Sequence, residues 1–260
     1  SSSIISMEDA PLSVVREKSD SSMAVGLKML AAGEGDAFVS AGNTGALYAG
    51  STLIVRRIKG VKKAAIATIM PFGRPMLMLD CGANVELAPE AYVQLAQMGT
   101  IYMRSIFGIP SPEVGLLNIR EERTKGTKLL VDVYNMLEQD PTINFKGNIE
   151  GKELPYGVCD VLVTDGFTGN IVLKLTEGCS SFLMQKIKDV FYSNFLTKAS
   201  ALFVKKGMTK LKNEFSASQY GGAPLLGISR PVIKAHGSSD AEAIKNAVRQ
   251  AIGYINTGII

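Results

Sequence analysis

One pattern recurs four times along the chain: a short apolar run ends in a turn rich in Gly, Asn, Asp and Ser, and a helix-like stretch follows. The four turns occupy residues 40–46, 79–84, 164–170 and 235–240. Such units predict an α/β fold with a mostly parallel sheet that is covered by helices on both faces. Ligands of such sheets bind beyond the carboxyl ends of strands, where helix N-termini present free N–H groups. The turns therefore favour a small anionic ligand.

Apolar spacing predicts the elements around these turns, and we expect one α/β domain over residues 1–260. The expected helices are Met23–Ala32, Gly45–Ile58, Pro89–Phe107, Lys128–Leu137 and Ser239–Ile255, the last with Ser238 or Ser239 as its N-cap. The expected strands are Ala37–Val39, Ala64–Met70, Met76–Asp80, Val114–Ile119, Ile143–Phe145, Val158–Thr164 and Val232–Ala235. The stretch 71–75 is expected to link the second strand to the third.

The segment 171–215 contains no expected strand and is predicted to form a long helix, a break at 192–194 and a second helix. The second helix has an apolar face made by Leu196, Ala199, Leu202, Phe203, Leu211 and Phe215. So much apolar surface on one helix pair must pack on something. We expect a helical hairpin that projects from the sheet and packs on its copy in a homodimer.

Charge is concentrated in the same segment. Residues 181–215 hold seven lysines against two acidic residues, a local charge of +5, whereas the whole chain has a net charge of +4. A basic patch indicates an acidic partner or an anionic membrane surface. A lysine-rich, solvated helix face accounts for the charge equally well.

Composition limits the class of protein. A chain with 46% hydrophobic and 20% charged residues is ordinary for a globular enzyme. No apolar run approaches the roughly 18 residues of a membrane span, and the first ten residues do not resemble a signal peptide. The three cysteines form no CxxC pair, so we expect reduced thiols in a cytoplasmic protein.

The first turn contains Gly42, Asn43, Thr44 and Gly45. Glycines allow the backbone to approach a ligand, and Thr44 can cap a helix while its hydroxyl contacts a phosphate oxygen. The turn lacks the GK[ST] ending of a P-loop and the dinucleotide G-x-G-x-x-G pattern, which argues against a nucleotide. A plain strand-to-helix connection remains the alternative.

Acidic and polar side chains flank the second and third turns. Asp165 ends a strand, and Asp80 and Asn84 bracket residues 81–83. Such carboxylates can hold Mg²⁺, but they can also fix loops as Asx-turns, which we favour. The spacing does not support zinc. Cys81 fits a small buried residue better than a thiolate nucleophile, and no G-x-S-x-G elbow occurs.

His236 is the one histidine of the chain. It stands between a strand end and a Gly-Ser-Ser-Asp helix start. A nearby helix N-terminus disfavours the imidazolium, so His236 would act as a neutral donor or base.

Taken in order, the motifs resemble those of the acyl-carrier-protein:phosphate acyltransferases of bacterial phospholipid synthesis, the PlsX family. The matching segments are Ser-Ala-Gly-Asn-Thr-Gly-Ala (40–46), Leu-Asp-Cys-Gly-Ala-Asn (79–84), Val-Gly-Leu-Leu-Asn (114–118), Val-Thr-Asp-Gly-Phe-Thr-Gly-Asn (163–170), Tyr-Gly-Gly-Ala-Pro-Leu-Leu-Gly (220–227) and Lys-Ala-His-Gly-Ser-Ser-Asp (234–240). The resemblance implies a fold similar to phosphotransacetylase and to isocitrate and isopropylmalate dehydrogenases, a homodimer, and synthesis of acyl phosphate without a cofactor.

Two departures from the family pattern stand out. Family members begin with a strand that leads into an Asp-Ala-Met-Gly-Gly-Asp turn, which this sequence lacks, so we expect an N-terminally truncated chain with part of the site's wall absent. Arg120 stands where the pattern has glycine, which leaves the role of the loop at 118–121 open.

The reaction fits a site without a triad. Phosphate is already anionic at neutral pH, and the leaving thiol has a pKa of roughly 8.5, so positioning and oxyanion stabilisation matter most. The resemblance implies a catalytic group of His236, Asp165 and Ser238, in which Asp165 orders its loop. It implies a phosphate and substrate group of Asn43, Thr44, Gly45, Asp80, Asn84, Thr168, Asn170 and Ser239.

The hairpin gains a role from the same resemblance. Acyl carrier protein is acidic, and Lys198, Lys205 and Lys206 flank an apolar stretch that includes Leu202 and Phe203. A basic amphipathic tip would bind that protein or lie peripherally on an anionic membrane. The expected partners are acyl carrier protein, inorganic phosphate and a second copy of the chain, and no nucleic acid.

Three other functions stay open at this point. A short-chain phosphotransacetylase that uses acetyl-CoA would need the same sheet but not the apolar hairpin. A metal- and NAD-dependent hydroxy-acid dehydrogenase would need a nucleotide loop that the sequence does not offer. A non-catalytic adaptor would dock carrier protein at the membrane.

Overall fold

The computed structural model describes residues 1–72, 74–214, 221–237 and 239–260. Eight strands form one sheet in the order β1-β8-β7-β2-β3-β6-β4-β5. The strands are β1 Phe38–Ser40, β2 Ala65–Phe72, β3 Arg74–Leu79, β4 Glu113–Asn118, β5 Asn144–Glu150, β6 Val161–Val163, β7 Ala223–Leu226 and β8 Val232–Lys234. The helices are α1 Ser22–Ala32, α2 Thr44–Gly50, α3 Pro89–Phe107, α4 Lys128–Gln139, α5 Gly166–Phe191, α6 Phe195–Glu214 and α7 Ala241–Asn256, with short helical turns η1 Pro11–Val15, η2 Ser51–Val55 and η3 Gly151–Tyr156.

The α/β prediction is confirmed, and the sheet is mixed. Strands β3, β6, β4 and β5 run parallel to one another, and β1 runs parallel to β8. The pairings β2–β3, β2–β7 and β7–β8 are antiparallel. As a result β1 and β8 run opposite to β3 and β6. The expected link at 71–75 is wrong, because Pro71 pairs with Pro75 and Phe72 with Arg74 in a β2–β3 hairpin.

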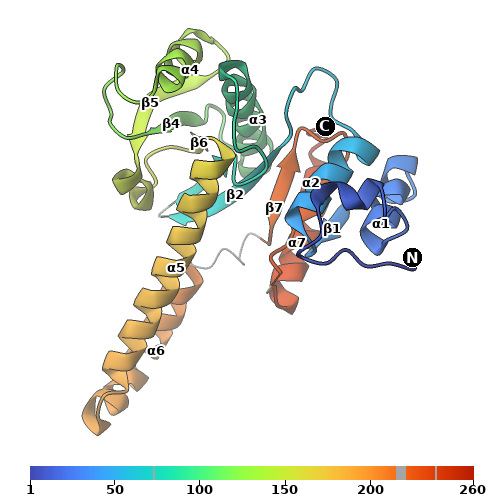
Figure 1. Cartoon of the computed structure of the whole chain (residues 1–260). Helices are drawn as coiled ribbons and strands as arrows, with labels where there is room; N and C mark the ends of the chain where they lie inside the picture. The colour runs from blue at the N-terminus through green and yellow to red at the C-terminus, as the bar shows by residue number, and fades with distance from the viewer. Residues whose placement is uncertain (73, 215–220, 238) are drawn as a thin grey trace.

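Side chains of the central strands point alternately to the two faces of the sheet, and they contribute to two hydrophobic cores. Met76 and Met78 of β3 contribute to one core, with residues of α1 and α2. Leu77 and Leu79 point the other way and pack with residues of α3 and α4. Figure 1 shows the result: β4, β5 and β6 lie with α3 and α4 on one side of the molecule, and β1 and β7 lie with α1, α2 and α7 on the other.

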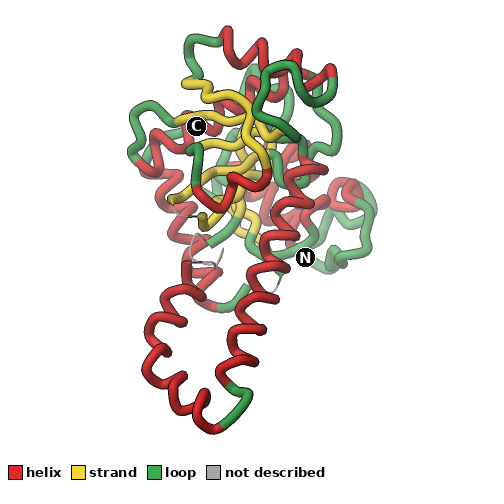
Figure 2. The backbone as a smooth tube through the Cα atoms, turned by 90° about the vertical axis from the view of Figure 1, so that its left-hand side faces the viewer, coloured by secondary structure: helices red, strands yellow, loops and turns green. Residues whose placement is uncertain are grey.

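The predicted hairpin is confirmed as a projection from this body. Helices α5 and α6 extend together away from the strands and join at a short turn around 192–194 (Figures 1 and 2). Helix α5 begins before the expected residue 171 because the Asp165 side chain accepts a hydrogen bond from the Thr168 N–H and caps it. Phe215, the last residue of the expected apolar face, lies outside the described residues.

Helix ends near the first and fourth turns differ from the prediction. The helix expected over Gly45–Ile58 begins at Thr44 and continues as η2 only to Val55, because Arg56 adopts φ 76° and breaks it. The expected N-cap Ser239 is wrong, since the Asp240 carboxylate accepts from Ala243 N and caps α7. The alternative cap, Ser238, lies outside the described residues.

Within the described part of the chain, no helix is both long and apolar enough to cross a bilayer.

Candidate active site

The second and third turns interlock at the ends of β3 and β6. Asp80 N donates to Thr164 O (3.0 Å), Thr164 N to Leu79 O (2.8 Å) and Gly166 N to Asn84 O (2.7 Å). Glycine is required at Gly169, because a Cβ there would overlap the carbonyl oxygen of Asp80. The two turns therefore form one rigid unit.

Asp80 lies at the centre of that unit and is fully buried. Its Oδ1 accepts from Ile66 N and Ala83 N, and its Oδ2 accepts from the backbone N and the side-chain Nδ2 of Asn84 at 2.8 and 2.7 Å. Burial raises the pKa of the Asp80 carboxyl, and these hydrogen bonds oppose the rise. Because the carboxylate is fully engaged, its geometry suits ordering of the loop rather than metal coordination.

No group of three or more His, Cys, Asp and Glu side chains placed to hold a metal occurs among the described residues. Cys81 beside Asp80 is buried, and burial raises the pKa of its thiol to about 12. A thiolate nucleophile is therefore disfavoured at this position.

Asp165 orders the third turn. Its Oδ1 accepts from Thr168 N (2.7 Å), and its Oδ2 accepts from Thr168 Oγ1 (2.9 Å). Burial raises the pKa of the Tyr92 phenol, and the nearby Asp165 carboxylate raises it further. Asn170, one turn further along α5, is half-buried and lies over the second turn, since a Cβ on Gly82 would be 3.6 Å from Asn170 Oδ1.

The first and fourth turns form a second unit, at the ends of β1 and β8. Ala235 N donates to Ser40 O at 2.9 Å, and a Cβ on Gly237 would be 3.9 Å from Ala41 O. His236 is exposed and makes contacts within the protein. Ser239 is half-buried and its N–H donates to His236 O, whereas Ser238 lies outside the described residues.

Asn43 holds the first turn in place. Its Oδ1 accepts from Ala46 N (3.0 Å), and its Nδ2 donates to the carbonyls of Ser6, Met7 and Asp9 at 3.0 to 3.2 Å. Direct contact between Asn43 and phosphate would require some of these bonds to break. Thr44 and Gly45 follow it in the first turn of α2 and are half-buried.

Tyr48 joins the two units. It projects from α2, and its hydroxyl lies 3.1 Å from both Asn84 Oδ1 and Ala64 O. Asn84 in turn donates to Ala64 O at 2.7 Å. Burial raises the pKa of the Tyr48 phenol and the Asp80 carboxylate raises it further, whereas the hydrogen bond to Asn84 and then the Arg57 charge oppose the rise. The four predicted turns thus lie in two pairs that Tyr48 connects.

Sequence reasoning assigned no role to Lys234, although the residue belongs to one of the quoted motifs. Lys234 ends β8, is half-buried, and its Nζ contacts Ala235 O. Burial lowers the pKa of its ammonium group. A lysine at a strand end beside a glycine-rich turn is the signal that could have identified Lys234.

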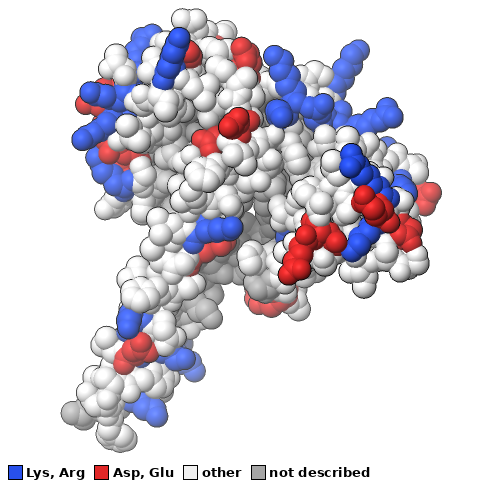
Figure 3. Space-filling view, viewed as in Figure 1, with Lys and Arg blue, Asp and Glu red and all other residues white. Residues whose placement is uncertain are grey.

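Most of the hairpin residues expected to meet a partner are exposed. Lys198, Lys205 and Lys206 are exposed, and the side chain of Phe203 is 91% exposed. Leu202 lies within α6. Figure 3 shows basic side chains along the hairpin with fewer acidic ones.

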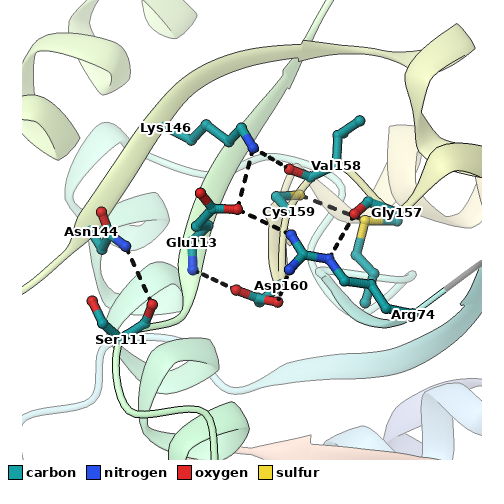
Figure 4. A network of polar contacts seen from close by, with 10 residues as sticks. Arg74, Ser111, Glu113, Asn144, Lys146, Gly157, Val158, Cys159 and Asp160 are labelled. Atoms are coloured by element: carbon teal, nitrogen blue, oxygen red, sulfur yellow. Dashed lines mark hydrogen bonds and ion pairs between the residues drawn. The ribbon is translucent and has the colours of Figure 1, made fainter.

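A separate cavity of about 510 Å³ opens at the other ends of the parallel strands. Its polar network joins Arg74 to Asp160 at 3.1 Å and to Glu113 at 3.0 Å, and Lys146 also reaches Glu113 at 3.2 Å (Figure 4). Hydrogen bonds from Arg74 and Lys146 lower the pKa of the Glu113 carboxyl. Two cations balance two carboxylates, so we interpret this network as a structural connection between strand ends.

Comparisons with known proteins agree with the residue pattern. The model of the family described as "fatty acid synthesis protein" matches residues 1–260. Two proteins named phosphate acyltransferase, from Caldanaerobacter subterraneus and Alkaliphilus oremlandii, are each 44% identical to this chain. The matches cover 100% and 98% of this chain and 78% and 76% of those proteins.

Solved structures extend the likeness to the fold. A phosphotransacetylase from Streptococcus pyogenes superposes with a TM-score of 0.61 at 18% sequence identity. The match covers 89% of this chain and 66% of the phosphotransacetylase chain. A phosphotransacetylase from Staphylococcus aureus superposes with a TM-score of 0.58 at 14% sequence identity, and the match covers 94% of this chain and 69% of that one. The fold is therefore phosphotransacetylase-like, and the chain belongs to the phosphate acyltransferase family of enzymes.

Proposed function

We propose that the chain transfers a long-chain fatty acyl group from the thioester of acyl carrier protein to inorganic phosphate, giving acyl phosphate for phospholipid synthesis. The observation that carries the proposal is the pairing of the four glycine-rich turns, with helices α2, α5 and α7 beginning at them. Helix N-termini and a half-buried lysine suit a phosphate nucleophile. Family membership supplies the reaction class.

In the proposed step, an oxygen of hydrogen phosphate attacks the thioester carbonyl carbon. The C–S bond then breaks, and the thiolate takes up the proton that phosphate loses, so acyl phosphate and free thiol form in equal amounts. No strong base is needed, because phosphate is already anionic and the thiol is a good leaving group. The protein contributes N–H groups and a cation placed for the developing charge.

The roles follow from which side-chain atoms are engaged. Asp80, Asn84, Asp165 and Thr168 hydrogen-bond one another or the backbone, so they position the second and third turns. Asn43 positions the first turn. The proposed phosphate contacts from these turns are the backbone N–H groups of Thr44 and Gly45 and the side chains of Thr44 and Asn170.

The fourth turn supplies the remaining groups. Lys234 would attract phosphate, while His236, Ser238 and Ser239 would contact phosphate or the thioester oxygen. His236 is exposed. His236→Ala tests the assignment, with His236→Gln as a variant that keeps a hydrogen-bond donor: we expect acyl-phosphate formation to fall about 100-fold in the alanine variant and less in the glutamine variant. Full activity in both variants would remove His236 from the mechanism.

For the hairpin, we propose a homodimer contact and a peripheral membrane contact in the cytoplasm. The only buried residues of α5 are Gly166 and Gly169, while Leu175, Phe182 and Val190 are 61 to 65% exposed. Apolar surface of this extent marks an interface. Sedimentation of the chain, with Phe182→Ser as the disrupting variant, tests the dimer. A monomer in the unchanged protein would contradict it.

The structural likeness to phosphotransacetylases makes acetyl-CoA the second candidate donor. Phosphate-dependent loss of palmitoyl carrier protein and of acetyl-CoA, measured side by side, separates the two. We expect the long-chain carrier thioester to be preferred by at least about 100-fold in kcat/KM, because a pocket that binds the longer chain gains about 0.8 kcal/mol per buried methylene. Carrier binding without acyl phosphate would instead indicate an adaptor.

A further inference from the structure

A second basic surface lies at the loop that joins η2 to β2. The loop, Arg56–Lys63, contains Arg56, Arg57, Lys59, Lys62 and Lys63 and no acidic residue. All five basic residues are exposed. Among the described residues, none of the five forms an ion pair, and Arg57 instead donates to the carbonyl of Lys62. Figure 3 shows basic side chains projecting from this part of the surface.

The backbone of this basic loop is fixed from several directions. Ile58 N donates to Gly227 O (2.9 Å), and Ser229 N donates to Arg56 O (2.9 Å). The side chain of Gln94, from α3, accepts from Lys62 N at 2.9 Å and donates to Gly60 O at 3.0 Å. The cations are therefore displayed on an ordered frame.

The basic loop borders the candidate active site. Ala64 follows it directly, and the Ala64 carbonyl accepts from both Tyr48 and Asn84. The positive charge of Arg57 also lowers the pKa of the Tyr48 phenol, whereas burial and the Asp80 carboxylate raise it. A partner held on the loop would thus sit at the rim of the site.

The chemistry of the loop differs from that of the hairpin. Its two apolar residues, Ile58 and Val61, are half-buried, and Val61 lies against Gly227. The hairpin instead exposes Phe195 (84%) and Phe203 (91%) beside its lysines. Membrane-binding elements need such apolar anchors, whereas charge without apolar contact favours fast, reversible binding of an acidic protein.

We propose that the basic loop Arg56–Lys63 is the docking surface for the acidic carrier protein that delivers the acyl thioester. The proposal rests on the proposed function, because it takes the donor to be protein-borne. It separates the two basic surfaces: the loop receives the carrier, and the hairpin contributes apolar contacts. A substrate protein that must leave after every turnover suits an electrostatic surface of this kind.

The test is a triple variant with Lys59→Gln, Lys62→Gln and Lys63→Gln. Its matched control is Lys28→Gln, Lys128→Gln and Lys245→Gln, three exposed lysines on α1, α4 and α7. We expect the loop variant to raise KM for palmitoyl carrier protein about tenfold and to flatten its salt dependence. The kcat, the KM for phosphate and the rate with an uncharged octanoyl-pantetheine thioester should change less than about twofold, and the control should match the unmodified chain.

An unchanged carrier KM in the loop variant, or an equal rise in the control, would overturn the proposal. So would a loss of binding to phosphatidylglycerol vesicles with carrier kinetics intact, which would assign the loop to the membrane. If the unmodified chain formed no acyl phosphate, the proposed function would fail separately. Direct titration of the carrier protein at low salt would then decide the role of the loop, with weaker binding by the loop variant expected.

Discussion

The Tyr48 hydroxyl lies 3.1 Å from Asn84 Oδ1, and this contact joins the two halves of the candidate site. Tyr48 belongs to the helix that follows the first turn, whereas Asn84 closes the second turn and donates to the buried Asp80 carboxylate at 2.7 Å. The β1–β8 pair and the β3–β6 pair run in opposite directions, and this contact fixes the position of their ends relative to each other. In the proposed reaction, phosphate and thioester meet between the two halves, so the relative position of the halves matters.

Tyr48→Phe removes the contact and keeps the ring. We expect kcat/KM for the carrier thioester to fall about tenfold through misalignment of the two halves, with a stability loss of only about 1 kcal/mol. Steady-state kinetics and urea unfolding measure the two effects. Equal kinetics in the variant and the unmodified chain would show that the contact does not position the site.

Asp80→Asn removes a buried charge but also removes acceptors for N–H groups in the second turn. We expect a net stability loss of about 1–3 kcal/mol, because an amide oxygen cannot replace both carboxylate oxygens. Unfolding free energies from urea titrations give the value. A variant as stable as the unmodified chain would contradict the loop-ordering role.

The same variant tests the pH dependence of stability. Since burial raises the Asp80 pKa above its ordinary 3.8, the folded state holds the proton more tightly than the unfolded state. The contribution of Asp80 to stability is full below that value and is lost as pH rises through the folded pKa. The stability difference between the unmodified chain and Asp80→Asn should therefore shrink as pH rises, and a difference that grew would reverse the assigned shift.

Lys234→Met tests the half-buried ammonium. We expect KM for phosphate to rise about 30-fold, with a smaller change in carrier KM. Lys245→Met, at an exposed lysine of α7, is the matched control and should leave phosphate KM unchanged. Because burial lowers the Lys234 pKa below 10.5, phosphate binding by the unmodified chain should weaken as pH rises through the lowered value. Identical alkaline profiles for the chain and Lys234→Met would contradict the role.

Arg74→Met tests the network at the opposite strand ends. The side chain of Asp160 is 4% exposed, and loss of its cation should cost about 1–2 kcal/mol of stability. Lys146→Met should cost less than about 1 kcal/mol, because the Lys146–Glu113 pair is exposed on both sides. Both variants should keep their kinetics. A large fall in kcat/KM for Arg74→Met would place function in the cavity of about 510 Å³.

Local chemistry explains which parts of the fold could be predicted. Pro89–Phe107 matches α3 at both ends, because proline begins the helix and Gly108 ends it in the left-handed conformation. The break predicted at 192–194 is confirmed between the end of α5 and the start of α6. The roles of Asp80 and Asp165 as loop-fixing carboxylates follow from their place after strands.

Long-range pairing explains what could not be predicted. Two prolines, Pro71 and Pro75, suggested a link where a β-hairpin forms, since prolines are tolerated at a strand end. The short β7, with its proline, was not expected as a strand. Tyr48 lies in an apolar run, and nothing in its spacing indicates that its hydroxyl reaches another turn. The partition of the turns into two pairs depends on strand direction, which is a property of the whole sheet.

The most direct test of the central claim uses phosphate labelled with ¹⁸O at all four oxygens and palmitoyl carrier protein. If phosphate attacks the thioester carbonyl, mass spectrometry will find acyl phosphate that retains all four labelled oxygens, with one free carrier thiol for each molecule formed. Palmitate in place of acyl phosphate, or an acyl phosphate whose bridging oxygen is unlabelled, would contradict the account.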